Sequence, residues 1–147
     1  METICCPSPD QPVIQPTEKT TRYRKALYAF MFGEIGGAIA RAYIFGLLTG
    51  IFHLISIWID YSAYATMHYC GTTIVCFCAV MEIMMLFMNA NDGGELQAAI
   101  FETTLSTAMY GAMMTFSIVK LVTTYKIYKV FKEEHQRQVP QVAGRFE

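Results

Sequence analysis

The fold is decided by residues 38–59, which read AIARAYIFGLLTGIFHLISIWI. The only strongly polar side chains in this stretch are those of Arg41 and His53. A helix of about 20 apolar residues matches the ~30 Å hydrocarbon core of a lipid bilayer. The stretch therefore predicts a helix that crosses a membrane.

Small residues recur at every fourth position of two stretches, and residues at this spacing share one helix face. The first set, called the first small ridge, is Ala38, Ala42, Gly46 and Gly50. The second small ridge is Ala99, Thr103, Thr107, Gly111 and Thr115. Because small side chains let helix backbones approach closely, these ridges predict close packing. Either the two helices pack against each other within one chain, or each helix packs against the same helix of a second copy.

The composition agrees with a membrane protein. Of the 147 residues, 54% are hydrophobic and 16% are charged, whereas soluble domains carry about 25% charged residues. Too little polar surface remains to cover a water-soluble globule of this size. The net charge of -1 argues against a nucleic-acid partner. The expected partners are the lipid bilayer and either further copies of the chain or a larger membrane complex.

Two further apolar stretches predict membrane helices over residues 67–88 and 96–122, the second extending to about residue 132. Residues 60–66 predict a short connection before the first of these. A turn is predicted at residues 89–95, since Asn, Asp and Gly supply the backbone angles that a helical hairpin needs. The predicted fold is therefore all-α, an integral membrane helical bundle with three, alternatively four, transmembrane helices.

The number of spans depends on residues 26–40, which are apolar but contain Glu34 and the pair Gly36 and Gly37. A full span needs at least about 17 residues, and no turn signal separates this stretch from the next. We therefore favour a helix that lies in the membrane interface, and hence three spans. Basic residues before the first span and after the last one instead require an even number of spans, because positive residues prefer the cytoplasm. A short fourth span at residues 26–40 is the alternative.

The flanks are more polar than the centre of the chain. Residues 1–21 are rich in Pro and predict a disordered tail, residues 22–132 form the predicted transmembrane domain, and residues 133–147 form a polar C-terminal tail. Cys5 and Cys6 are either lipidation sites or ordinary tail residues.

Charged residues within the apolar stretches are the chemical leads. Glu82 and Glu102 lie on either side of the predicted turn at 89–95, each about 9 Å from the end of its span. In the three-span arrangement Arg41 begins its helix on the same side. This set predicts either a path for ions or protons, or a clamp between helices in which the acids are paired or protonated. His53 is interpreted as a packed or hydrogen-bonding residue.

No motif of an enzyme or of a metal site is present, so we assign no catalytic, cofactor-binding or metal-ligating residue. Cys76 and Cys78 are two residues apart and so face different sides of a helix. The sequence favours a non-enzymatic protein that acts as a packing, assembly or trafficking partner in a membrane complex. The alternative is a small transporter, channel subunit or proton-conducting element, and a membrane enzyme is a third class without a supporting motif. We expect the protein to lie in an endomembrane or in the plasma membrane, and the mitochondrial inner membrane is the alternative location.

Two segments carry a resemblance to a known family. Residues 41–55, RAYIFGLLTGIFHLI, and residues 124–133, TYKIYKVFKE, resemble the small multispanning, lysosome-associated LAPTM-like membrane proteins. The resemblance covers about a third of the chain and implies a four-span endomembrane protein that acts as a binding or trafficking partner. It implies no functional residues.

Overall fold

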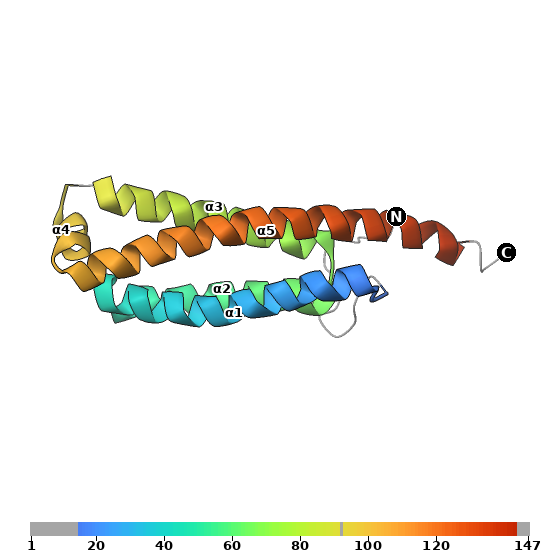
Figure 1. Cartoon of the computed structure of the whole chain (residues 1–147), viewed down its shortest axis with the longest axis horizontal. Coiled ribbons are helices and arrows are strands. Elements are labelled where there is room, and N and C mark those ends of the chain that lie inside the picture. The colour runs from blue at the N-terminus through green and yellow to red at the C-terminus, as the bar shows by residue number, and fades with distance from the viewer. Residues whose placement is uncertain (1–14, 92, 144–147) are drawn as a thin grey trace.

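The computed structural model describes residues 15–91 and 93–143, and every regular element in these ranges is a helix. The all-α class predicted from the sequence is confirmed. Four long helices run in alternating directions, and a short helix lies across one end of the bundle (Figure 1). In chain order the helices are α1 (Glu18–Phe45), α2 (Leu47–Thr66), α3 (Tyr69–Asn91), α4 (Glu95–Phe101) and α5 (Thr104–Ala143).

The first helix begins earlier than the sequence predicts. Thr17 caps α1, because its hydroxyl accepts a hydrogen bond from the Thr20 amide at 3.2 Å, while the Thr20 hydroxyl accepts one from the Thr17 amide at 2.8 Å. This reciprocal arrangement satisfies two amide groups at the start of the helix. The predicted tail at residues 1–21 therefore ends at Thr17 in the described part of the chain. The rest of that prediction, with Cys5 and Cys6, lies outside the described residues.

The stretch 38–59 is not one continuous helix, which corrects the prediction. The chain reverses direction at Gly46, whose backbone has φ +93° and ψ 158°. Residues other than glycine essentially never adopt this combination of backbone angles. After the reversal Gly50 lies so close to α1 that a Cβ atom there would be 2.7 Å from the Ala38 carbonyl oxygen. The first small ridge thus folds back on itself and joins α1 to α2.

The helix α2 also runs further than predicted, to Thr66, so that residues 60–66 are helical rather than a connection. It ends at Met67, which takes the left-handed conformation with φ 49°. The next helix, α3, begins two residues later at Tyr69.

The stretch 96–122 is likewise divided. The predicted turn at residues 89–95 is followed by α4, and α5 begins only at Thr104. Thr103 and Ser106 cap the start of α5, where the Ser106 amide donates to the Thr103 hydroxyl at 3.0 Å. The helix then continues through the predicted polar tail as far as Ala143.

The beginning of α1 and the end of α5 lie at the same end of the bundle (Figure 1). Two contacts between them show this: the Gln15 amide donates to Gln138 Oε1 at 2.7 Å, and Lys19 Nζ is 3.8 Å from Glu133 Oε2. The arrangement of four long helices therefore brings the two basic flanks together.

Two of the helices in the described ranges are long and apolar enough to cross a membrane. They are α3, over Tyr69–Asn91, and α5, over Thr104–Gln138. Much of the outer surface of the bundle is apolar. On α2 and α3 the most exposed apolar side chains are those of Leu47, Leu48, Trp58, Phe77, Phe87 and Met88.

Replacing Gly46 by Ala tests the reversal between α1 and α2. Because the conformation of Gly46 is strained for any side chain, we expect Gly46→Ala to lower the free energy of unfolding by about 1–3 kcal/mol. Thermal unfolding in a mild detergent, followed by circular dichroism, measures the loss. The control is Gly36→Ala, which adds a methyl group within α1 where no atom lies within 4 Å. Equal melting temperatures for the two variants would contradict this account of the turn.

Candidate functional site: a buried charge network

Six charged or titratable side chains meet at the centre of the bundle and form what we call the buried charge network. All four long helices contribute, and each of the six residues is at most 9% exposed to solvent. The members are Glu34 and Arg41 of α1, His53 and Asp60 of α2, Glu82 of α3 and Lys120 of α5.

Apolar clusters lie on both sides of this network along the bundle. Toward the end that carries the termini, Leu27, Val75 and Ile127 belong to one cluster. Toward α4, Ile44 and Leu86 belong to the other. Charges held between apolar layers are expensive to bury unless they are paired and hydrogen-bonded. Removal of one partner from such a contact would leave an uncompensated buried charge, so the members of the network depend on one another.

Lys120 connects two of the carboxylates. Its ammonium nitrogen contacts Glu34 Oε1 and lies 3.0 Å from Asp60 Oδ2. The three residues come from α5, α1 and α2, so this single cation ties three helices together. Both oxygens of Asp60 are buried without a hydrogen bond in the described part of the chain, and the ion pair with Lys120 is its compensation.

His53 lies between the carboxylates of Glu34 and Glu82. Its Nε2 contacts Glu34 Oε2, and its Nδ1 is 3.6 Å from Glu82 Oε1. An imidazole can offer a proton from both nitrogens only when it is protonated. The ring of His53 thus bridges a carboxylate of α1 and a carboxylate of α3.

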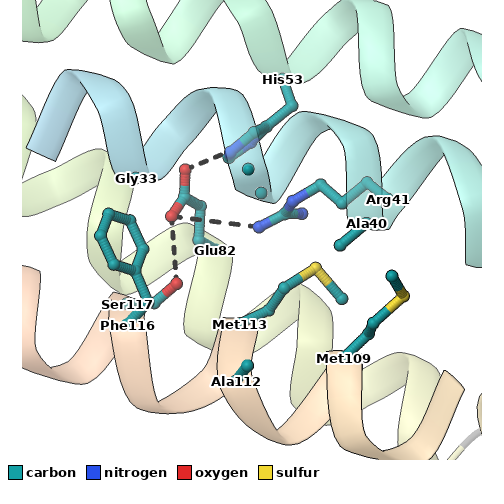
Figure 2. A pocket seen from close by; sticks show the side chains of 12 residues that line it. Gly33, Ala40, Arg41, His53, Glu82, Met109, Ala112, Met113, Phe116 and Ser117 are labelled. Atoms are coloured by element: carbon teal, nitrogen blue, oxygen red, sulfur yellow. Dashed lines mark hydrogen bonds and ion pairs between the residues drawn. The ribbon is translucent and has the colours of Figure 1, made fainter. Parts of the chain in front are cut away.

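Glu82 is the most fully coordinated acid. The hydroxyl of Ser56 donates to Oε1 at 3.2 Å, and the hydroxyl of Ser117 donates to Oε2 at 3.3 Å. The Arg41 guanidinium lies 4.0 Å from Oε2. Figure 2 shows the His53, Arg41 and Ser117 side chains converging on this carboxylate.

A cavity of about 290 Å³ adjoins Glu82 and His53. It lies between α1 and α5, where glycines of α1 face larger apolar side chains of α5 (Figure 2). A Cβ atom on Gly33 would come within 2.2 Å of the Phe116 ring, so glycine is required for the close approach at this point. The lining residues are Gly33, Gly36, Gly37, Ala40, Arg41, His53, Glu82, Met109, Ala112, Met113, Phe116 and Ser117.

Part of the network has the donor atoms of a metal site. Glu34, His53 and Glu82 each offer one ligand atom, and these atoms lie within 4.8 Å of one another. Two carboxylates and an imidazole suit divalent transition metals. A metal at this position would have to compete with Lys120 for Glu34.

The structure brings together two of the three charges that the sequence singled out. Arg41 and Glu82 are paired, as predicted. Glu102 is not part of the set, which corrects the prediction: it is exposed and directly follows α4 at the end of the bundle. The prediction placed Glu102 within a membrane span. In the structure Glu102 lies between the short helix α4 and the start of α5 at Thr104.

The sequence alone did not place four members of the network in a common site. They are Glu34, His53, Asp60 and Lys120. Their spacing carried a signal, because Glu34 and Arg41 are seven residues apart in α1, and His53 and Asp60 are seven apart in α2. Residues at this spacing share one helix face. Polar residues recurring on one face of an otherwise apolar helix indicate a polar core.

The two small ridges also differ in role. The first ridge packs within the hairpin of α1 and α2, as described above. In the second ridge Thr103, Thr107, Gly111 and Thr115 are exposed, and a Cβ atom on Gly111 would meet no atom within 4 Å. The predicted contact between the two ridges is therefore absent from the described part of the chain.

A further histidine, His68, lies outside the network in the connection between α2 and α3. Its Nδ1 accepts a hydrogen bond from the Cys70 amide at 3.2 Å, and its ring is 5.4 Å from that of His135. Burial lowers the pKa of His68, and the charge of His135 lowers it further. The surroundings of His68 therefore favour its neutral form.

In comparisons with protein-family models, with curated proteins and with solved structures, nothing matches this chain. The resemblance to LAPTM-like proteins therefore stays a prediction. What the chain does has to be argued from its own residues.

Replacing Lys120 by Met tests the energetic role of the network. Glu34 and Asp60 would lose their shared cation in a buried site, so we expect Lys120→Met to cost about 3–5 kcal/mol of unfolding free energy. Adding Glu34→Gln and Asp60→Asn to the same chain removes the uncompensated charges and should recover most of the loss. Thermal unfolding of the three forms measures both effects. If Lys120→Met alone is as stable as the original chain, Lys120 does not hold these helices together.

Proposed function

We propose that this chain is a non-enzymatic integral membrane protein of four spans that binds and passes a proton through its buried charge network. The observation that carries the proposal is the inverted distribution of polarity: charges lie inside the bundle, whereas apolar side chains face outward. A surface of this kind is unfavourable in water and matches a hydrocarbon environment. Ionisable groups that face the interior of a membrane bundle commonly mark ion or proton paths.

The helix lengths support four spans. The shortest of the long helices, α2, has 20 residues and measures about 30 Å, the thickness of the hydrocarbon core. Four spans place both basic flanks on one side, as the charge rule requires. On this arrangement Lys19, Arg22 and Lys25 of α1 and Lys126 and Lys129 of α5 lie on the cytoplasmic side.

The charge balance of the network favours one bound proton. Glu34, Asp60 and Glu82 supply three negative charges, whereas Arg41 and Lys120 supply two positive ones. A proton on His53 makes the network neutral, and its contacts to Glu34 and Glu82 place it well for that proton. Net neutrality matters here because uncompensated charge is costly in a membrane.

The cavity between α1 and α5 supports movement of that proton. Its volume of about 290 Å³ exceeds the roughly 30 Å³ that one water occupies in the liquid. A short chain of water molecules at Glu82 and His53 would connect the network to the seam between the two helices. An interhelical clamp would need the same ion pairs but would have no use for such a cavity.

Proton flux into liposomes containing the purified protein tests the proposal. A pH-sensitive dye inside the vesicles should report acidification faster than in empty vesicles when a pH gradient is imposed. We expect His53→Gln and Glu82→Gln each to reduce the flux to the level of empty vesicles, because each removes a group that holds the transferred proton.

The control for this experiment is Glu102→Gln, which removes an acid that is exposed at the bundle end. Its flux should equal that of the original chain. If the original chain conducts no faster than empty vesicles, the network is a clamp. If conduction survives both His53→Gln and Glu82→Gln, another path carries the protons.

A second candidate function is that of an assembly or trafficking partner, and the exposed second small ridge favours it. Its open position at Gly111 would allow another helix to approach closely. The predicted resemblance to LAPTM-like proteins implies the same role in an endomembrane. For either function we propose an endomembrane or plasma-membrane location, with the mitochondrial inner membrane as the alternative.

Native mass spectrometry in mild detergent tests this second candidate. If the ridge forms a contact between copies of the chain, Gly111→Leu should shift the population from oligomer to monomer, because the larger side chain separates the helix backbones. Thr73→Leu, which enlarges an exposed residue of α3, is the control and should leave the oligomer intact. A monomeric original chain would rule out self-assembly through the ridge.

A further inference from the structure

We propose that a second site, separate from the charge network, binds the headgroup of an anionic phospholipid. The site is a hollow of about 1170 Å³ between the beginning of α1 and the C-terminal half of α5. We call it the basic groove and define it by four cations, Lys19, Arg22 and Lys25 of α1 and Lys126 of α5. This inference goes beyond proton transfer and rests only on the proposed membrane location.

Three of the four cations are free to bind a ligand. Arg22, Lys25 and Lys126 are exposed and form no ion pair within the described part of the chain. Lys19 is paired with Glu133 at 3.8 Å, but both side chains are more than half exposed, so that pair is weak.

The acids of the groove do not neutralise these cations. Glu18 and Glu134 are the two carboxylates that line it, which leaves an excess of two positive charges. Glu134 is already engaged, because the Arg137 guanidinium donates to its Oε1 at 3.4 Å.

Other cations at the same end of the bundle are occupied by aromatic rings. The Arg24 guanidinium lies 4.3 Å from the centre of the Tyr64 ring, and Lys129 Nζ lies 4.7 Å from that of Tyr125. Cation–π contacts of this kind satisfy part of the charge. The unpaired charges therefore gather at the groove rather than around the whole bundle end.

Helix stability does not explain the positions of the cations in α1. Lys19 lies in the first turn of α1, where the positive end of the helix dipole disfavours a cation, and Arg22 and Lys25 follow in the next two turns. An anion in the groove would interact favourably with both the cations and the dipole. Two neighbouring hydroxyl groups, those of Thr21 and Thr123, also line the groove and can donate hydrogen bonds to phosphate oxygens.

The surroundings of the groove favour a lipid over a free anion. Exposed apolar residues continue from it along the same faces: Phe32 lies seven residues beyond Lys25 in α1, and Val122 and Val119 precede Lys126 in α5. Acyl chains can follow these residues while the headgroup occupies the groove. The cations also adjoin apolar packing, because Lys25 in α1 and Lys126 in α5 lie next to Leu27 and Ile127 of the apolar cluster near this end of the bundle.

Lipid titration against the full chain in mild detergent, read by native mass spectrometry, tests the proposal. Phosphatidylinositol phosphate and phosphatidylserine are the anionic probes, and phosphatidylcholine is the zwitterionic comparison. We expect the anionic lipids to bind more tightly than phosphatidylcholine. Each lost groove cation should weaken their binding about fivefold, so that a variant combining Arg22→Gln, Lys25→Gln and Lys126→Gln loses about a hundredfold.

The matched control combines Arg24→Gln, Lys129→Gln and Lys132→Gln, which removes the same charge from the same two helices outside the groove. Its lipid affinity should stay within about fivefold of the original value. An equal loss in both variants would overturn the proposal, since the effect would then reflect net charge alone. Equal binding of phosphatidylcholine would also overturn it. Inorganic phosphate provides the last comparison: if it displaces the lipid at equal concentration, the groove is a site for soluble anions.

Discussion

The rest of the structure depends on the contact of Lys120 with Glu34 and Asp60. A buried ammonium group without partners would cost several kcal/mol, so α5 can occupy its place only if α1 and α2 present these two acids. The depth of each helix relative to the others is therefore set by charge pairing at the centre. A shift of α5 along its neighbours would separate Lys120 from both acids, whereas apolar side chains can exchange one apolar neighbour for another. The polar centre thus supplies specificity that a uniformly apolar bundle would lack.

The bundle consists of two helical hairpins, and the cavity lies between them. The first hairpin is held by the close contact of Gly50 with α1, and the second hairpin joins α3 to α5. The two hairpins meet along two seams, one between α2 and α3 and one between α1 and α5. The cavity and the basic groove both lie along the seam between α1 and α5. At Gly33 the two helices approach so closely that a Cβ atom would overlap the Phe116 ring. At Gly36 a Cβ atom would have no neighbour within 4 Å.

Some of this arrangement could be predicted from the sequence. The length of the apolar stretches identified the all-α class and, within a few residues at each end, the extent of α3. The Asn, Asp and Gly residues identified the turn after it. The pairing of Arg41 with Glu82 followed from the cost of burying either charge alone. The break at Gly46 was missed because a glycine with positive φ and a glycine in a helix look alike in an apolar sequence. Glu102 was misplaced for a related reason, since a short α4 and the first turn of a long helix have the same composition. Lys120 and Asp60 looked like flanking residues, and their burial became apparent only when the helices were placed side by side.

The length of α5 has a mechanical consequence. Its 40 residues extend about 60 Å, roughly twice the hydrocarbon thickness, so the helix continues well beyond the bundle core (Figure 1). The segment from Lys120 to the end of α5 measures about 35 Å at 1.5 Å per residue. A tilt of about 10° about Lys120 would therefore move that end by about 6 Å. Because α5 is one continuous helix over this segment, a small change of its tilt at the ion pairs would become a larger displacement at its far end.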